Sequence, residues 1–128
     1  MKRILIVDDE PHVIRVLRLC LQREGYEVDS VSEPRAAIEK LRTLAPDVLI
    51  TDIQMPGMTG KELCEYIQAE LPQREFLVLV MTSMTARENR QWVSKMANTE
   101  FLEKPLSPRS LILRLSAYFA AAPAAAGA

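Results

Sequence analysis

The sequence predicts an α/β domain of five alternating strand and helix units, with a parallel sheet covered by helices on both faces. Short apolar runs rich in branched residues alternate with longer segments whose apolar residues recur every three or four positions. Proline, glycine and capping residues separate these segments. Such alternation is typical of right-handed crossovers in a doubly wound parallel sheet. A chain of 128 residues, 48% of them hydrophobic, suits one domain of this kind.

The first segments set the pattern. Residues 3–7 predict a buried strand, because Arg3 is followed by the apolar run Ile4–Val7. Pro11 then opens a helix, and Gly25 ends it in the left-handed conformation that glycine readily adopts. Residues 26–31 predict a weaker, more exposed strand near an edge of the sheet. The predicted inward face of the helix consists of Val13, Val16, Leu17, Cys20 and Leu21.

A second helix and a third strand follow. Ser32 caps a helix that the chain enters through Pro34, and Pro46 ends it. Residues 48–50 then form a short apolar run, as expected of a strand buried on both faces. Asp52 stands where this strand ends, before a loop rich in proline and glycine.

The third helix and the fourth strand have clear boundaries. Thr59 and Glu62 form a capping box, so a helix should begin there, and Pro72 should close it. Residues 76–81 are six apolar residues between polar flanks, which is too short for an independent helix. They predict another buried strand.

The last two units rest on weaker patterns. Residues 85–88 form a second capping box, but the helix that it opens is polar as far as Trp92. Residues 101–102 predict a short fifth strand. Ser107 and Pro108 then cap and start a last helix with an apolar inward face.

Composition and charge argue against several classes of protein. The net charge is −1, and the cationic side chains are scattered among acids, so we do not expect nucleic acid as a direct partner. The apolar run at residues 4–7 is too short for a secretory signal or a membrane span, and we therefore expect a cytoplasmic protein without membrane contact. Cys20 and Cys64 lie far apart without neighbouring ligands and predict two free thiols. We expect one domain over residues 1–119 and a frayed, alanine-rich tail over residues 120–128.

Reactive or polar side chains occur where the predicted strands end. Asp8 and Asp9 follow the first strand, Asp52 the third, Thr82 the fourth and Lys104 the fifth. In a doubly wound sheet, ligands bind outside the carboxyl ends of the strands, where the strand order reverses. If the first and third strands are neighbours, three carboxylates meet, and each pair ~4 Å apart repels by about 4 kcal/mol at an effective dielectric of about 20. The strand ends therefore predict a bound cation.

Magnesium is the ion that these residue types favour. A site with few ligands, all of them oxygens, suits a hard ion that keeps its waters, whereas zinc would require histidine or cysteine. Lys104 supplies a second positive charge. A carboxylate flanked by magnesium, an ammonium group and a hydroxyl donor is what phosphoryl transfer to Asp52 would need, because that reaction puts charge on the phosphoryl oxygens.

Together these residues resemble the response-regulator receiver domain of two-component signalling. The matching set is the pair Asp8-Asp9, then Asp52 in Asp-x-x-Met-Pro-x-Met-x-Gly, then Thr82, then Lys104-Pro105, and it spans nearly the whole chain. The resemblance implies a flavodoxin-like sheet with strand order 2-1-3-4-5. It also implies a phosphorylation-dependent signalling switch, in which a partner histidine kinase or phosphotransfer protein donates a phosphoryl group to Asp52. Such a protein is a phosphoacceptor with no separate substrate turnover.

The resemblance further implies a role for each site residue. Magnesium would bind Asp9, Asp52 and the main-chain carbonyl of Gln54, with Asp8 assisting through water. Thr82 would hold a phosphoryl oxygen.

Lys104 would pair with the phosphoryl group, and its bond to Pro105 would be cis. The resemblance also implies a conformational switch. Thr82 would move toward the phosphoryl group while Phe101 turns inward, and this would remodel the face made by the fourth helix, the fifth strand and the fifth helix. An unknown protein partner would read that face, and we expect a monomer or a weak homodimer. Ala97-Asn98 stands where the family usually has a glycine–alanine pair, and Asn98 could adopt the left-handed conformation of that glycine.

Two other functions remain open from sequence alone. A phosphatase of the haloacid dehalogenase type also uses an aspartate nucleophile and magnesium. That family has Asp-x-Asp on its first strand, however, whereas Gln54 stands two residues after Asp52 here and the strand is the third. The other alternative is an interaction module that works without phosphorylation. His12, the only histidine, is expected to be a solvated surface residue rather than a phosphoryl carrier.

Overall fold

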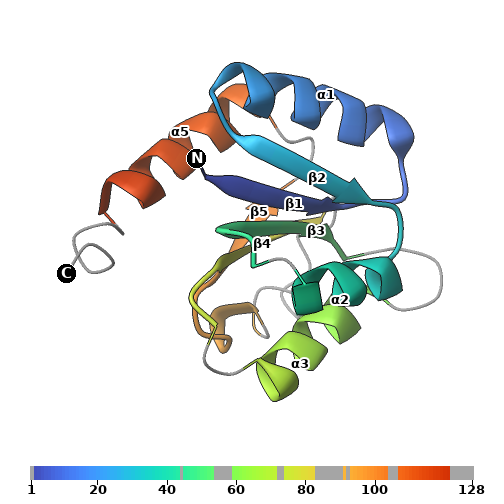
Figure 1. The fold of residues 1–128 in the computed structure, drawn as a ribbon. Helices are drawn as coiled ribbons and strands as arrows, with labels where there is room; N and C mark the ends of the chain where they lie inside the picture. Colours follow the sequence, from blue (N-terminus) through green and yellow to red (C-terminus); the bar gives the residue numbers. More distant parts are fainter. Residues whose placement is uncertain are drawn as a thin grey trace.

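A computed structural model describes residues 2–43, 45–53, 59–71, 74–82, 91, 93–103 and 107–121, with the side chain of Thr82 excepted. It has the predicted α/β architecture, in which one parallel sheet lies between two layers of helices (Figure 1). The strands are β1 (Arg3–Val7), β2 (Glu27–Val31), β3 (Val48–Asp52), β4 (Leu77–Thr82) and β5 (Thr99–Glu103). The helices are α1 (Pro11–Arg23), α2 (Pro34–Thr43), α3 (Gly60–Glu70) and α5 (Pro108–Ala121).

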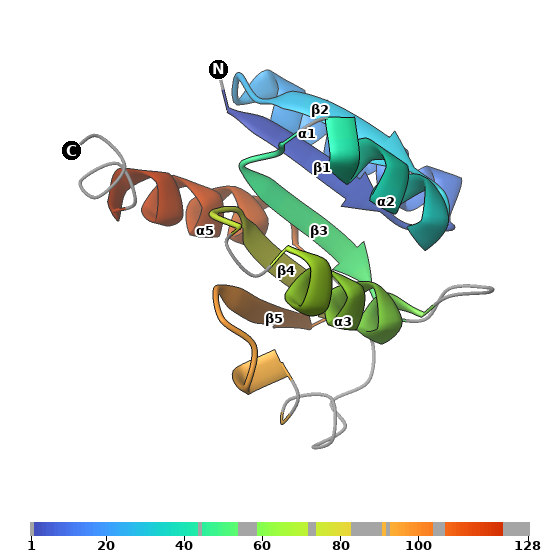
Figure 2. The ribbon, with the colours of Figure 1, turned by 60° about the horizontal axis from the view of Figure 1, so that its bottom comes forward.

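The five strands pair in the order β2-β1-β3-β4-β5, which confirms the predicted order (Figure 2). All neighbouring strands are parallel, so their carboxyl ends lie at one edge of the sheet. Val7, the last residue of β1, pairs with Val31 of β2 and Thr51 of β3. The end of β1 therefore lies beside the end of β3, as the predicted carboxylate site requires. β2 is an edge strand, again as predicted.

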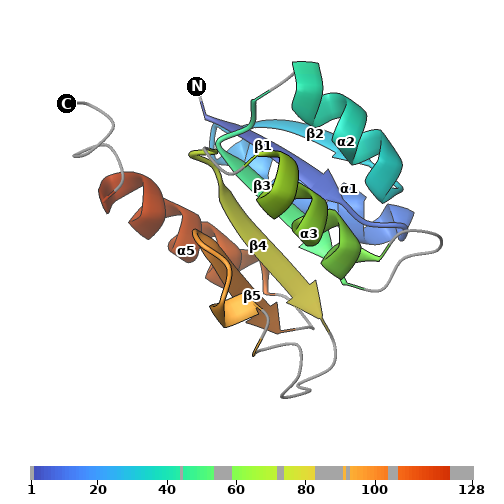
Figure 3. The same cartoon turned by 90° about the horizontal axis from the view of Figure 1, so that it is seen from below.

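The sheet separates two hydrophobic cores. Leu5 and Val7 of β1 point to the side of α2 and α3, where Leu63 and Ile67 join them. Ile4 and Ile6 point to the other side, toward α1 and α5. Figure 3 shows α2 and α3 in front of the sheet and α1 behind it. Because alternate residues of β1, β3 and β4 serve opposite cores, these strands contain continuous buried apolar runs, at Ile4–Val7, Val48–Ile50 and Leu77–Met81.

One detail of the predicted helix faces is wrong. Val16 was expected on the inward face of α1, but its side chain is 49% exposed. It lies about 100° around the helix from the buried Leu17, outside the stripe that reaches the sheet.

The predicted helix ends are largely confirmed. The Thr59 hydroxyl accepts from the Glu62 amide at 3.1 Å, and the Glu62 carboxylate accepts from the Thr59 amide at 2.9 Å. This is the capping box expected at the start of α3. Gly25, after α1, has φ of 92°, as expected of a left-handed cap.

Asn98 also adopts the left-handed conformation expected of it, with φ of 51°. Its side-chain amide donates to the carbonyl of Phe76 at 2.9 Å and to that of Glu75 at 3.2 Å. Its own carbonyl accepts from the Val78 amide at 3.0 Å. Asparagine therefore replaces the usual glycine here and also ties the start of β5 to the start of β4.

Replacing Asn98 with alanine should lower the free energy of unfolding by about 1–3 kcal/mol, through backbone strain and two lost hydrogen bonds. Asn98→Gly relieves the strain but loses the same hydrogen bonds, so it should cost less than the alanine variant. Urea unfolding of the three proteins measures both effects. Equal stability of the alanine variant and the wild type would contradict this account.

Both cysteines are free thiols, as predicted. Burial raises the pKa of the Cys64 thiol to about 12, with a smaller opposing effect of Arg74. Cys64 is therefore a protonated core residue near neutral pH rather than a reactive nucleophile.

Several predicted features lie outside the described residues. They include the capping box at residues 85–88, Trp92, the Lys104–Pro105 bond and residues 122–128 of the tail. Of the fourth helix, the structure describes residues 91, 93 and 94 as helical. α5 continues through Ala121, two residues into the segment expected to be the tail. No helix in the described part of the chain is both long enough and apolar enough to cross a membrane.

Candidate functional site

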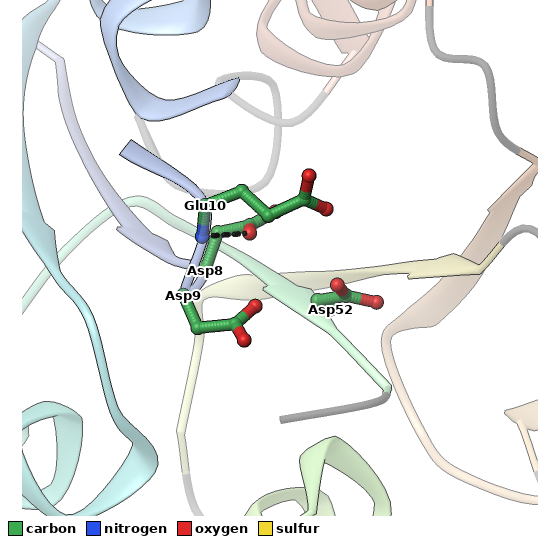
Figure 4. Close-up of side chains that lie close together, drawn as sticks. All are labelled: Asp8, Asp9, Glu10 and Asp52. Carbon is green, nitrogen blue, oxygen red and sulfur yellow. Dashed lines mark hydrogen bonds between the residues drawn. The ribbon is translucent and has the colours of Figure 1, made fainter. Parts of the chain in front are cut away.

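Four carboxylates gather at the carboxyl ends of β1 and β3 (Figure 4). Asp8, Asp9 and Glu10 come from the turn after β1, and Asp52 is the last residue of β3. One carboxylate oxygen from each residue lies within 4.8 Å of the other three. Asp8 and Asp52 are buried, at 0% and 6% exposure, whereas Asp9 and Glu10 face solvent. The cluster is therefore a negatively charged site with a buried floor and an open mouth.

The turn after β1 holds the first three carboxylates in place. The Asp8 amide continues the sheet by donating to the Val31 carbonyl at 3.2 Å. The Glu10 amide then bends back and donates to Oδ1 of Asp8 at 2.9 Å, the bond drawn in Figure 4. Pro11 begins α1 directly afterwards. The side chains of three consecutive residues are thus brought into one cluster, whereas along a strand they would point to alternate faces of the sheet.

The backbone around Asp52 is packed closely against α3. The Ile53 amide donates to the Met81 carbonyl at 3.1 Å, and the Gly60 amide donates to the Ile53 carbonyl at 2.8 Å. A Cβ atom at Gly60 would lie 1.9 Å from the carbonyl oxygen of Asp52. Only glycine fits at this position, because the first turn of α3 rests on the main chain that carries the acid.

The donor chemistry of the cluster fits a hard divalent cation. All four members are carboxylates, and at close range like charges destabilise each other unless a cation neutralises them. Oxygen ligands with open access for water are what Mg²⁺ prefers, since it keeps several of its own waters. Asp8, Asp9 and Asp52 are the residues that could bind it directly or through water.

The structure brings three predicted site residues together: Asp8, Asp9 and Asp52. Thr82 ends β4, one residue beyond Met81, which pairs with Asp52, but its side chain is not described. Gln54 and Lys104 lie outside the described residues. Phe101, the proposed switch residue, is half-buried on β5 and packs against the core beside α2 and α3.

Two residues near the site were not singled out from the sequence. Glu10 could have been included, because it directly continues the acidic pair Asp8-Asp9. Gly60 appeared only as a loop residue before a helix. It is also the last residue of the motif Asp-x-x-Met-Pro-x-Met-x-Gly, but the motif does not show that Gly60 approaches the main chain of Asp52 so closely.

Comparison with protein families gives one match over most of the chain. The family model described as the response regulator receiver domain matches residues 4–116. This range includes the four-carboxylate cluster and all five strands except Arg3, the first residue of β1.

Solved structures with the same architecture cover nearly the whole chain. The chemotaxis protein CheY4 of Vibrio cholerae is 31% identical, with a TM-score of 0.83 over 91% of this chain and 97% of that one. The response regulator TrrA of Thermotoga maritima, solved in complex with Mg²⁺-BeF, is 32% identical, with a TM-score of 0.78 and the same coverage.

The curated relatives described here are of two different lengths. An uncharacterised 14.6 kDa protein of Leptolyngbya boryana is 34% identical over 121 residues, and the match covers 94% of this chain and 92% of that protein. Four other bacterial proteins are 27–32% identical; three are described as transcriptional regulatory proteins, one of these as probable, and the fourth as a DNA-binding response regulator. The chain spans about half the length of these four.

Proposed function

The chain belongs to the response regulator receiver domain family, and we propose that it is a switch that a histidine kinase or phosphotransfer protein controls by phosphorylating Asp52. Members of this family are phosphoacceptors rather than enzymes with a separate substrate turnover. The proposed reaction moves a phosphoryl group from a nitrogen of the donor's histidine to a carboxylate oxygen of Asp52. The P–N bond breaks as the P–O bond of an acyl phosphate forms.

The position of Asp52 carries this proposal. Its carboxylate stands at the end of a central strand, within 4.8 Å of the carboxylates of Asp8 and Asp9. Its main chain is held from both sides, by Met81 on β4 and by the first turn of α3. A nucleophile fixed in this way meets an incoming phosphorus atom without losing further conformational entropy.

Magnesium is the proposed cofactor. Asp9, Asp52 and the main-chain carbonyl of Gln54 would bind it, with Asp8 assisting through water. When bound, the ion supplies positive charge that offsets the charge of the carboxylates and of the phosphoryl oxygens. The donor set of the cluster supports this assignment, as does the Mg²⁺-BeF complex of the related TrrA.

The remaining residues are proposed to bind the phosphoryl group or to transmit the conformational change to a partner protein. We assign Thr82 to a phosphoryl oxygen and Lys104 to the phosphoryl charge. The conformational change would pass through Phe101 to the face of the fourth helix, β5 and α5. The proposed reader is an unknown protein in the cytoplasm, with the chain acting as a monomer or weak homodimer. One relative, of which the match covers 50%, is described as a DNA-binding response regulator, and DNA binding is thus one output that a longer protein with a similar segment has.

Intact mass after incubation with a small phosphodonor and MgCl₂ tests the function. The wild type should gain the mass of one phosphoryl group, and the gain should disappear with a magnesium chelator. Asp52→Asn keeps the shape of the side chain but removes the nucleophilic carboxylate, so this variant should gain nothing.

Other outcomes of the same experiment favour the alternatives. An equal mass gain in the wild type and in Asp52→Asn would place the phosphoryl group elsewhere. No gain in the wild type would favour an interaction module that works without phosphorylation. Sustained magnesium-dependent hydrolysis of a phosphate ester over many turnovers would favour a phosphatase.

A further inference from the structure

Thr51 is a buried polar residue that directly precedes Asp52 on β3. In the sheet it lies between Val7 of β1 and Val80 of β4, and both valines belong to the core beside α2 and α3. Valine has the same branched shape as threonine, so packing alone does not require a hydroxyl at this position. A buried hydroxyl also costs free energy unless it is hydrogen-bonded. The hydrogen bond that it makes is therefore the feature to examine.

The hydroxyl of Thr51 holds the peptide unit that follows Asp52. It donates to the main-chain carbonyl of Asp52 at 3.0 Å. At the other end of the same peptide unit, the Ile53 amide donates to the Met81 carbonyl at 3.1 Å. Because a peptide unit is planar, hydrogen bonds to its oxygen and from its N–H together restrict how it rotates relative to the Cα of Asp52. The acid is thus held by the strand on one side and by this peptide unit on the other.

The carbonyl oxygen that Thr51 binds also lies against α3. A Cβ atom at Gly60 would come within 1.9 Å of it. Contact with α3 limits the space around the oxygen, whereas the hydroxyl of Thr51 fixes its direction, because a hydrogen bond depends on orientation. A change in that direction would turn the start of the segment that leads from Asp52 to Gln54, the proposed main-chain ligand of magnesium.

We propose that Thr51 is a positioning residue for the phosphorylation of Asp52, and that its hydroxyl acts by orienting the peptide unit after the acid. This inference rests on the proposed function and adds a residue that is fully buried and does not reach the phosphodonor itself. Its effect is on geometry. A carboxylate that leaves its position meets the phosphorus atom less often in a productive orientation, so the reaction slows.

Two substitutions at Thr51 separate the hydroxyl from the methyl group. Thr51→Val removes the hydroxyl and keeps the shape. At saturating MgCl₂ it should lower the maximum rate of phosphorylation by a small phosphodonor about 3- to 10-fold and leave the half-saturating donor concentration unchanged. Thr51→Ser keeps the hydroxyl and should react at nearly the wild-type rate. It should nevertheless unfold at a lower urea concentration than Thr51→Val, because the lost methyl group leaves a cavity in the core.

Ile50→Val is the matched control on the same strand. Ile50 is fully buried and precedes Thr51, but its side chain belongs to the core beside α1 and α5. The substitution removes one methylene group and leaves the hydroxyl of Thr51 in place. It should lower the urea midpoint, as Thr51→Ser does, and retain the wild-type rate of phosphorylation.

Three outcomes would overturn the inference. A wild-type rate in Thr51→Val would mean that the hydrogen bond only satisfies a buried hydroxyl, and it would leave the proposed function intact. Rates that fall with stability in Thr51→Ser and Ile50→Val would assign the effect to general instability. If the wild type gains no phosphoryl group, or if Asp52→Asn gains one equally well, the proposed function fails and this inference fails with it.

Discussion

Replacing Gly60 with alanine is expected to lower the free energy of unfolding by about 3 kcal/mol and to slow phosphorylation of Asp52 about tenfold or more. The added Cβ would fall 1.9 Å from the carbonyl oxygen of Asp52 and 2.8 Å from the Cα of Ile53. Both are main-chain atoms, so no side-chain rotation can relieve the overlap. Either α3 moves away from the sheet or the end of β3 shifts. In both cases the carboxylate of Asp52, the proposed acceptor, leaves its position. Urea unfolding and the initial rate of phosphorylation by a small phosphodonor measure the two effects.

Gly25→Ala is the control for this variant. Gly25 has φ of 92°, and a Cβ there would meet no atom within 4 Å. Its replacement should cost about 1 kcal/mol through backbone strain and leave the phosphorylation rate of the folded protein unchanged. Wild-type stability and rate in Gly60→Ala would show that the close approach has no consequence. A loss of rate in both variants would point to general instability rather than to the position of Asp52.

Replacing Asp8 with asparagine is expected to affect stability and metal binding in opposite directions. Asp8 is fully buried and lies within 4.8 Å of three other carboxylates, so we expect the repulsion among these charges to lower the stability of the metal-free protein. Asparagine keeps the oxygen that accepts from the Glu10 amide, and its NH₂ group can donate to a neighbouring carboxylate. Without divalent ions, Asp8→Asn should therefore gain about 1–2 kcal/mol in the free energy of unfolding. In magnesium it should lose most of the stabilisation that the ion gives the wild type.

Thermal and urea unfolding with a chelator and with MgCl₂ give both quantities for Asp8→Asn. Asp29→Asn, on β2 and outside the cluster, provides the matched control and should change neither quantity much. If Asp8→Asn were less stable than the wild type without divalent ions, the charge of Asp8 would be well compensated within the protein. An undiminished response to magnesium would remove Asp8 from the metal site.

The sequence was sufficient to predict the sheet because each strand has a distinct local pattern. The runs at residues 4–7 and 48–50 are apolar on both faces, and only central parallel strands bury both faces. The edge position of β2 followed from its mixed composition. Boundaries were less accurate. β5 runs from Thr99 to Glu103 rather than over two residues, because the residues that flank Phe101 and Leu102 are polar and are half-buried or exposed.

Part of the carboxylate site could also be predicted, in this case from the arrangement of the strands rather than from a local pattern. Asp8, Asp9 and Asp52 could be brought together from sequence because parallel strand ends share one edge of a sheet. The role of Gly60 could not be predicted from the sequence, since it depends on how closely α3 approaches β3. Asn98 lies between these cases. Its left-handed conformation was foreseeable from residue type, but its bonds to Glu75 and Phe76 depend on the neighbouring strand.

Because the cluster is divided between β1 and β3, the site forms only in a completely folded chain. These strands are separated in the chain by β2 and two helices, and they meet only after the crossover is complete. Neither Asp52 nor the acidic turn forms the site alone, so an incompletely folded copy would offer the donor an ordinary solvated aspartate. Signal acceptance would thus be confined to correctly folded molecules, without any separate device for checking them.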